Sequence, residues 1–140
     1  MVFKSQICTT KEQSERLLAL GLKKESADMA LVENWDWNEE DGKFFTGEYF
    51  ERPIDYVEGL RDKWIPAWSL HRLMEIMPKN IGCYEQFVSC YKNDVMYINN
   101  DGYYFFNRTK NDNLYDGIID CIKWAIVNQY INQHFLEEKK

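Results

Sequence analysis

The spacing of apolar residues changes several times along this chain, and each change indicates a different kind of secondary structure. Residues 67–77 carry apolar side chains at i, i+3, i+4 and i+7, the pattern of one helix face. Residues 9–21 and 114–132 have similar helical spacing, and the first of these has a capping-box start and Gly21 as a stop signal. Three helices are therefore predicted.

Two further residues are expected at the N-termini of helices. Pro66 can occupy the first turn of the helix over 67–77, with Ser69 as an alternative N-cap. Ser26 can cap a further helical turn through residues 27–31.

Residues 33–50 have the alternating pattern of a strand pair. Trp35 and Trp37 alternate with polar residues, residues 39–42 form a turn sequence, and residues 44–50 suit the returning strand. A hairpin with an acidic tip is therefore predicted.

Residues 83–107 are rich in aromatic and β-branched residues, which predicts a three-stranded antiparallel meander over 83–91, 95–98 and 103–107. Large rings alternate along the last strand and so occupy both faces, and a homodimer through this aromatic sheet is one consequence. With the helices, these strands predict an α+β fold: an antiparallel sheet of three to five strands packed by about three helices, in a single domain over residues 1–140.

The apolar content and the cysteines indicate the compartment. The longest apolar stretch, residues 121–127, contains a lysine and is far shorter than the roughly 20 residues that span a bilayer. The N-terminus lacks a signal-peptide pattern, so no membrane association and a cytoplasmic location are predicted. In that reducing compartment four free thiols are expected in or near the core: Cys8, Cys83, Cys90 and Cys121.

The charge of the chain is concentrated in one segment. The net charge is −6, and residues 33–62 hold ten acidic and three basic residues, a net charge of −7. Direct nucleic-acid binding is disfavoured, because it needs clustered Lys and Arg. A basic protein partner is favoured, and the candidate interaction residues are Trp35, Asp36, Trp37, Glu39, Glu40, Asp41 and Trp64. The alternative is that the rings belong to the core and the acids keep the surface soluble.

The pattern of reactive residues favours no catalytic site, metal or cofactor. The Cys and His residues lack zinc spacing, and the glycines lack a phosphate-loop pattern. Ser69 is better explained as a helix cap than as a nucleophile, because His71 lies two positions on and points away. Asp116 and Asp120, at i and i+4, are expected on a solvated helix face. The alternative is a small hydrolase or metal-dependent enzyme that uses this pair or the acids of residues 33–62.

Three stretches occur in a characteristic order: Cys8–Leu18 running on to Gly21, Ile65–Leu70 running on to Pro78, and Tyr115–Ile122. This order resembles a family of small uncharacterised proteins encoded by phages and prophages of gut bacteria. The resemblance implies a mobile-element accessory protein and brings no activity, cofactor or catalytic residue with it. The predicted function is therefore a non-enzymatic protein-interaction module of mobile-element origin.

Overall fold

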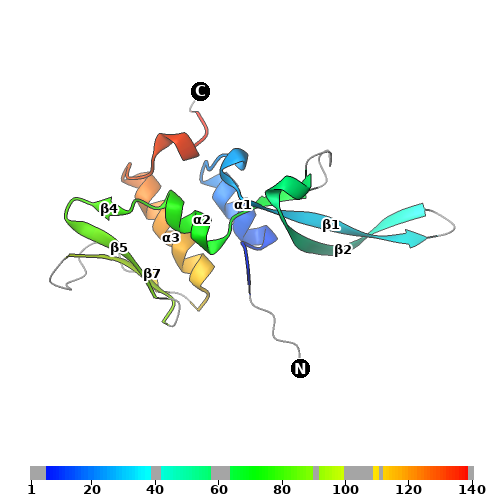
Figure 1. Cartoon of the computed structure of the whole chain (residues 1–140), viewed down its shortest axis with the longest axis horizontal. Helices are drawn as coiled ribbons and strands as arrows, with labels where there is room; N and C mark the ends of the chain where they lie inside the picture. The colour runs from blue at the N-terminus through cyan, green and yellow to red at the C-terminus, as the bar shows by residue number, and fades with distance from the viewer. Residues whose placement is uncertain are drawn as a thin grey trace.

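The structure of the chain is a computed structural model that describes residues 6–38, 42–57, 64–89, 92–99, 109–110 and 112–138. Within these residues the helices lie between two antiparallel sheets (Figure 1). The predicted α+β class is confirmed. The strands are divided between two sheets and are not gathered in one.

The elements of the described residues are as follows in chain order. The α-helices are α1 (Lys11–Ala19), α2 (Leu70–Ile76) and α3 (Leu114–Val127), and the 3₁₀-helices are η1 (Lys24–Ser26), η2 (Ile54–Val57) and η3 (Gln133–Phe135). One sheet has the order β2–β1–β3, formed by β1 (Met29–Asn38), β2 (Gly42–Pro53) and β3 (Trp64–Ala67). The other has the order β4–β5–β6–β7, formed by β4 (Asn80–Ile81), β5 (Tyr84–Ser89), β6 (Asp94–Ile98) and β7 (Thr109–Lys110).

Helix α1 has the two ends that its sequence predicts. Gln13 N–H donates to Thr10 Oγ1 and Thr10 N–H donates to the Gln13 side chain, so the capping box is complete. At the other end Gly21 has a φ of 104°, and Leu22 N–H donates to the Leu17 carbonyl. This is a Schellman ending, in which glycine adopts the left-handed backbone without strain.

Helix α3 begins with Asn113 as its N-cap but ends earlier than predicted. The sequence predicted a helix to residue 132, whereas α3 ends at Val127. Gln129 has a φ of 63°, and Tyr130 N–H donates to the Ala125 carbonyl at 2.8 Å. This end therefore has Schellman geometry with glutamine at the position where glycine is usual. The sequence did not indicate this end because no glycine marks it.

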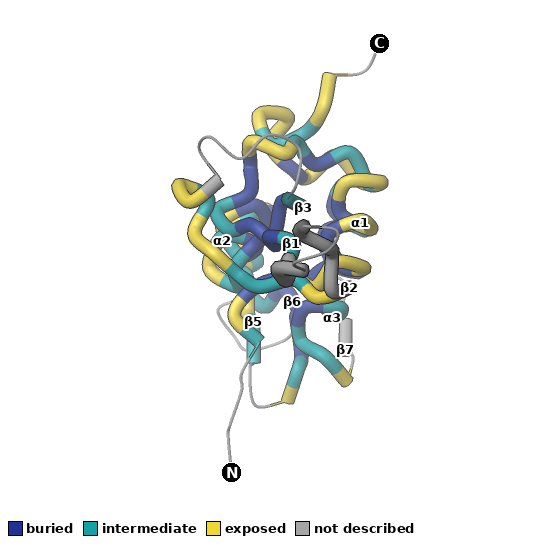
Figure 2. Tube along the Cα trace, turned by 90° about the vertical axis from the view of Figure 1, so that its right-hand side faces the viewer, coloured by how far each residue is buried: buried dark blue, intermediate teal, exposed yellow. Residues whose placement is uncertain are grey.

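Two hydrophobic clusters hold these elements together. The larger one joins the three α-helices to β6, and its largest fully buried side chains include Trp68, Tyr97, Leu73 and Ile118. The smaller one contains Cys8, Leu31 and Ala67 and lies against one face of the three-stranded sheet. Viewed along the hairpin, the buried parts of the trace gather at the centre of the molecule and the exposed parts lie at its rim (Figure 2).

The buried residue Trp68 connects three segments that are distant in the sequence. Its indole Nε1–H donates to Ser26 Oγ at 3.0 Å, its backbone N–H donates to Thr9 Oγ1, and its carbonyl accepts from Thr9 N–H. Next to it, the Asp28 carboxylate accepts from the backbone N–H and the hydroxyl of Ser69. These bonds fix the junction between β3 and α2 against η1 and the start of α1.

The predicted helix start at Ser26 is wrong, and of the two predicted starts for α2 the structure shows Ser69. Residues 27–31 do not form a helical turn, because Ser26 closes η1 and β1 begins at Met29. Pro66 lies in β3, where it pairs with Ala30, and the alternative N-cap Ser69 is confirmed. Proline is tolerated in β3 because this strand is at the edge of its sheet.

The strand predictions are largely confirmed. The hairpin forms as β1 and β2, and two strands of the meander form as β5 and β6. The third predicted strand, 103–107, lies outside the described residues, so the homodimer through it stays a prediction. The strand that the structure shows beside β6 is β7.

The described cysteines are free thiols, two of them buried. Cys8 and Cys121 lie in the core as predicted, but Cys83 is exposed. Cys83 was expected in or near the core, and this expectation is wrong because the residue lies in the turn between β4 and β5. Cys90 lies outside the described residues. Across the described part of the chain, no helix combines the length and hydropathy that crossing a membrane requires.

Candidate functional site

The β1–β2 hairpin projects from the body of the molecule, beyond the helices (Figure 1). Strand β3 pairs with β1 only over residues 29–32. Beyond that point, β1 and β2 pair only with each other among the described strands. We call this two-stranded ribbon, residues 33–38 and 42–49, the arm.

The arm begins at a β-bulge. The pairing of Glu33 with Tyr49 is followed by that of Trp35 with Phe45, so one residue of β1, Asn34, lies opposite three residues of β2. A bulge bends a strand and increases its local twist. The ribbon therefore changes direction close to Trp64, the first residue of β3.

The predicted interaction residues fall in three places. Part of the set lies in the arm, in the last residues of β1: Trp35, Asp36 and Trp37. Another part lies between β1 and β2, outside the described residues: Glu39, Glu40 and Asp41. Trp64 begins β3 at the base of the sheet, where its half-buried ring centre lies 4.0 Å from the Lys24 ammonium. Trp64 thus lies at the base of the arm, opposite Val32, and not within the arm.

The backbone register places large residues opposite one another in the arm. Trp35 pairs with Phe45, and Trp37 pairs with Lys43. The sequence from residue 33 to residue 49 has five aromatic residues, six acidic residues and one lysine, a net charge of −5. Most of the charge imbalance of the chain is therefore carried by one projecting hairpin.

Asp116 and Asp120 form ion pairs between α3 and α1. Arg16 on α1 contacts both: Nη1 lies 3.3 Å from Asp116 and Nη2 lies 2.9 Å from Asp120. Gln13 donates a further hydrogen bond to Asp116. Both carboxylates remain partly exposed, at 32% and 42%, so this face of α3 is solvated as expected while it also contacts α1. Among the described residues, no group of three His, Cys, Asp or Glu side chains is placed to hold a metal ion.

Two buried groups, the Cys8 thiol and the Tyr97 hydroxyl, have raised pKa values. Burial raises the pKa of the Cys8 thiol to about 12, and the carboxylates of Glu51 and Asp28 add to the shift. Burial also raises the pKa of the Tyr97 hydroxyl, which donates to the Pro78 carbonyl. At neutral pH both groups are protonated, so neither is suited to act as a nucleophile.

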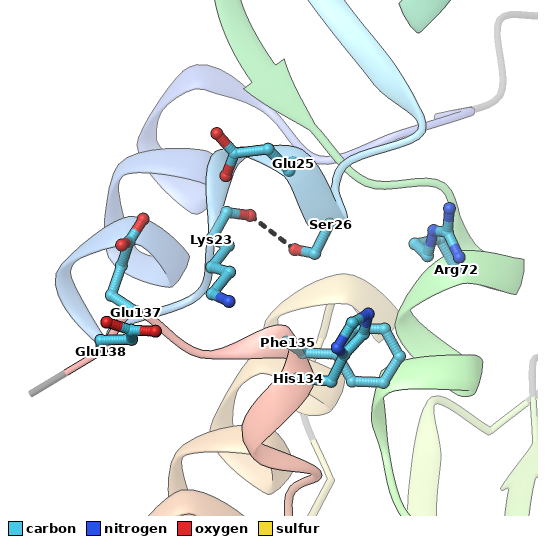
Figure 3. A pocket seen from close by; sticks show the side chains of 8 residues that line it. All are labelled: Lys23, Glu25, Ser26, Arg72, His134, Phe135, Glu137 and Glu138. Carbon is cyan, nitrogen blue, oxygen red and sulfur yellow. Dashed lines mark hydrogen bonds between the residues drawn. The ribbon is translucent and has the colours of Figure 1, made fainter.

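A pocket of about 670 Å³ forms where the end of the chain meets the segment after α1 (Figure 3). Leu22 and Leu136 form an antiparallel bridge, Lys23 N–H donates to the Phe135 carbonyl, and Glu137 N–H donates to the Gly21 carbonyl. We call this the C-terminal pocket. It is lined by Lys23, Glu25, Ser26, Arg72, His134, Phe135, Glu137 and Glu138.

The charges in the C-terminal pocket are divided along its length. Figure 3 shows Glu137 and Glu138 at one end and Arg72 at the other, with Lys23 and His134 between them. Two bases and three acids line it, a net charge of −1 with histidine neutral. The pocket therefore offers separate acidic and basic ends.

Comparison of the chain with protein-family models, with curated proteins and with solved structures found no match. The functional argument therefore depends on the geometry. The resemblance to phage and prophage proteins stays a prediction.

Sequence reasoning identified the arm and missed the C-terminal pocket. The acidic and aromatic content of residues 33–49 is visible as a local pattern. Arg72, Lys23 and His134 lie in three separate segments, and none has a spacing that points to the others. The bridge between Leu22 and Leu136 brings the segment that contains His134 beside the segment that contains Lys23.

Proposed function

We propose that this chain is a protein-binding module that docks a basic protein surface through its arm, in the setting of a mobile-element accessory protein. The observation that carries the proposal is the projection of the arm beyond the helices, within a sequence segment, residues 33–49, whose charge is −5.

The first support is the energetics of the arm. A two-stranded ribbon without a third strand or a covering helix is marginally stable in water. The three-stranded part of this sheet ends at Val32, and the described strands supply no further neighbour to the arm. A partner that covers the ribbon would provide the missing burial.

The second support is the combination of charge and rings. Acidic residues steer a basic partner during encounter and keep copies of this chain apart. Tryptophans in the middle of an interface commonly contribute the largest share of binding energy. The arm has both kinds of residue within one hairpin, in alternation along β1 from Glu33 to Trp37.

The test compares two variants of equal net charge. The arm variant carries Asp36→Asn, Glu39→Gln, Glu40→Gln and Asp41→Asn. The body variant carries Glu12→Gln, Glu15→Gln, Glu85→Gln and Asp112→Asn, which are exposed positions outside the arm. Immobilised wild type and both variants are exposed to bacterial lysate at 50 and 300 mM salt, and retained proteins are identified and then purified for titration.

We expect a basic protein to bind wild type and the body variant equally. Binding should be at least about tenfold weaker for the arm variant and at 300 mM salt, because screening shortens the reach of exposed charges to less than about 10 Å. Equal affinity of the two variants, or no retained protein at either salt concentration, would contradict the proposal. A further variant, Trp35→Ala with Trp37→Ala, tests the anchors at unchanged charge.

A further inference from the structure

We propose that the C-terminal pocket binds a small zwitterionic ligand, with a carboxylate at the Arg72 end and an ammonium group at the end formed by Glu137 and Glu138. The ligand class is a carboxylate joined to an ammonium by a short alkyl chain, as in free lysine or in a lysine at the C-terminus of a peptide. This site is separate from the arm and does not depend on it.

The basic end of the pocket has unused hydrogen-bonding capacity. Arg72 Nη1 lies 3.7 Å from a Glu75 carboxylate oxygen, which is an ion-pair contact and too long for a hydrogen bond. Arg72 Nε is buried and has no hydrogen-bond partner among the described residues. A buried donor without a partner is unusual in folded proteins and calls for an explanation such as a ligand.

The geometry of this guanidinium favours a carboxylate. Nε and Nη2 form one side of the planar fork, and this pair donates two parallel hydrogen bonds to a carboxylate. The Arg72 side chain lines the pocket and is 31% exposed, but Nε is buried, so binding requires the guanidinium to turn its Nε side towards the ligand. Binding would then give Nε the acceptor that it lacks in the present arrangement.

The acidic end of the pocket is equally incomplete. Within the described chain, neither Glu137 nor Glu138 has an ion-pair partner within 4.0 Å, and the same holds for Lys23 and Glu25. The hydrogen bond from Glu137 N–H to the Gly21 carbonyl fixes the backbone at Glu137. The exposed carboxylates of Glu137 and Glu138 can therefore receive an ammonium group without a prior rearrangement of the backbone.

The balance of charge excludes a simple anion. A lining charge of −1 repels phosphate, which carries more negative charge than a carboxylate and has no positive group for the glutamates. A zwitterion matches both ends at once. The volume, about 670 Å³, is within the range of small-molecule sites, and Phe135 supplies an apolar surface for an alkyl chain.

The test uses 6-aminohexanoate as the probe and follows backbone amide shifts of residues 23–26 and 133–138 by NMR. Hexanoate, hexylamine and inorganic phosphate are the comparison compounds. We expect a dissociation constant on the order of 1 mM for 6-aminohexanoate, and at least about tenfold weaker binding of each comparison compound. No shift with 6-aminohexanoate at 50 mM, or equal binding of phosphate, would overturn the proposal.

Variants separate the two ends of the site. Arg72→Lys keeps the charge and removes the fork, so 6-aminohexanoate should bind about tenfold more weakly while the melting temperature stays close to that of wild type. Glu137→Gln with Glu138→Gln should weaken binding of 6-aminohexanoate, which loses the partner of its ammonium group, and should not weaken binding of hexanoate. Arg52→Ala, on β2, is the matched arginine control and should change neither. Unchanged binding in both pocket variants would refute the assignment.

Two further probes identify the source of the ligand. L-lysine represents the free amino acid, and N-acetyl-glycyl-lysine represents a peptide end. Tighter binding of either one supports the proposal and names the source. Failure of both at concentrations where 6-aminohexanoate binds would overturn the ligand class.

Discussion

Removal of the Ser26 hydroxyl offers a quantitative test of the junction that Trp68 forms. Ser26 Oγ accepts the indole hydrogen bond at 3.0 Å and donates to the Lys23 carbonyl at 2.6 Å. In Ser26→Ala the fully buried indole N–H loses its acceptor, at a cost of about 1–3 kcal/mol, and the bond to Lys23 is lost as well. We expect the free energy of unfolding to fall by about 2 kcal/mol and the melting temperature by roughly 8 °C.

A double-mutant cycle isolates the indole bond. Trp68→Phe removes the N–H together with some packing, and in that background Ser26→Ala should cost only about 0.5–1 kcal/mol, because no buried donor is left unpaired. The expected coupling energy is therefore about 1–1.5 kcal/mol, measured by urea unfolding followed by circular dichroism. Ser89→Ala, far along β5, is the control and should be additive with Trp68→Phe.

Additive costs of Ser26→Ala and Trp68→Phe, within about 0.3 kcal/mol, would refute this reasoning. The bond seen between the two side chains would then contribute nothing that water does not replace. Equal destabilisation by Ser89→Ala in the same background would instead indicate a general loss of cooperativity.

Three other predictions follow from single residues. Gln129→Gly should raise the free energy of unfolding by about 1 kcal/mol in urea titrations, because glycine adopts a φ of 63° without strain. Asn128→Gly is the control: Asn128 has a φ of −93°, so this change should lower the free energy of unfolding. Arg16→Ala should cost less than about 1 kcal/mol, because both of its ion pairs are solvent-exposed, and a cost above 2 kcal/mol would contradict this. Burial raises the pKa of the Cys8 thiol from 9.0 to about 12, so above pH 9 the unfolded state releases a proton that the folded state keeps. Stability should therefore fall with rising pH, by roughly 1 kcal/mol at pH 10. Cys8→Ala should remove this slope, and Cys83 should react with iodoacetamide far faster than Cys8 in the native protein because it is exposed.

The elements that the sequence predicted well are those whose ends are set by local chemistry. Helix α1 has a capping box at Thr10 and a glycine at its end, so both of its limits could be recognised. The end of α3 could not, since Gln129 takes a backbone conformation that its side chain does not favour. The rings of Tyr130 and Trp124, with their centroids 5.5 Å apart, contact each other across this helix end.

Strand β3 shows a second limit of local patterns. Pro66 suits the first turn of a helix, and nothing near it in the sequence indicates a sheet edge. Its strand conformation depends on pairing with Ala30, which lies far away in the sequence. Likewise, the sequence predicts Ser26 as a helix cap, because its hydrogen-bond partner Trp68 is 42 positions away and leaves no local signal.

The candidate sites differ in the same way. The arm is one continuous stretch, so its charge and rings could be counted from the sequence. The C-terminal pocket takes its walls from three segments that are distant in the sequence, so its lining depends on the fold. The arm could therefore be predicted from the sequence, and the C-terminal pocket could not.

The bridge between Leu22 and Leu136 also affects the order in which parts of the protein can form during synthesis. During synthesis, residues 23–26 and Arg72 emerge well before His134 and its neighbours. The pocket can therefore form only after the later residues have emerged. Closing a loop of this length slows the contact further. In a nascent chain, residues 33–49 would thus be available before the C-terminal pocket has all of its lining.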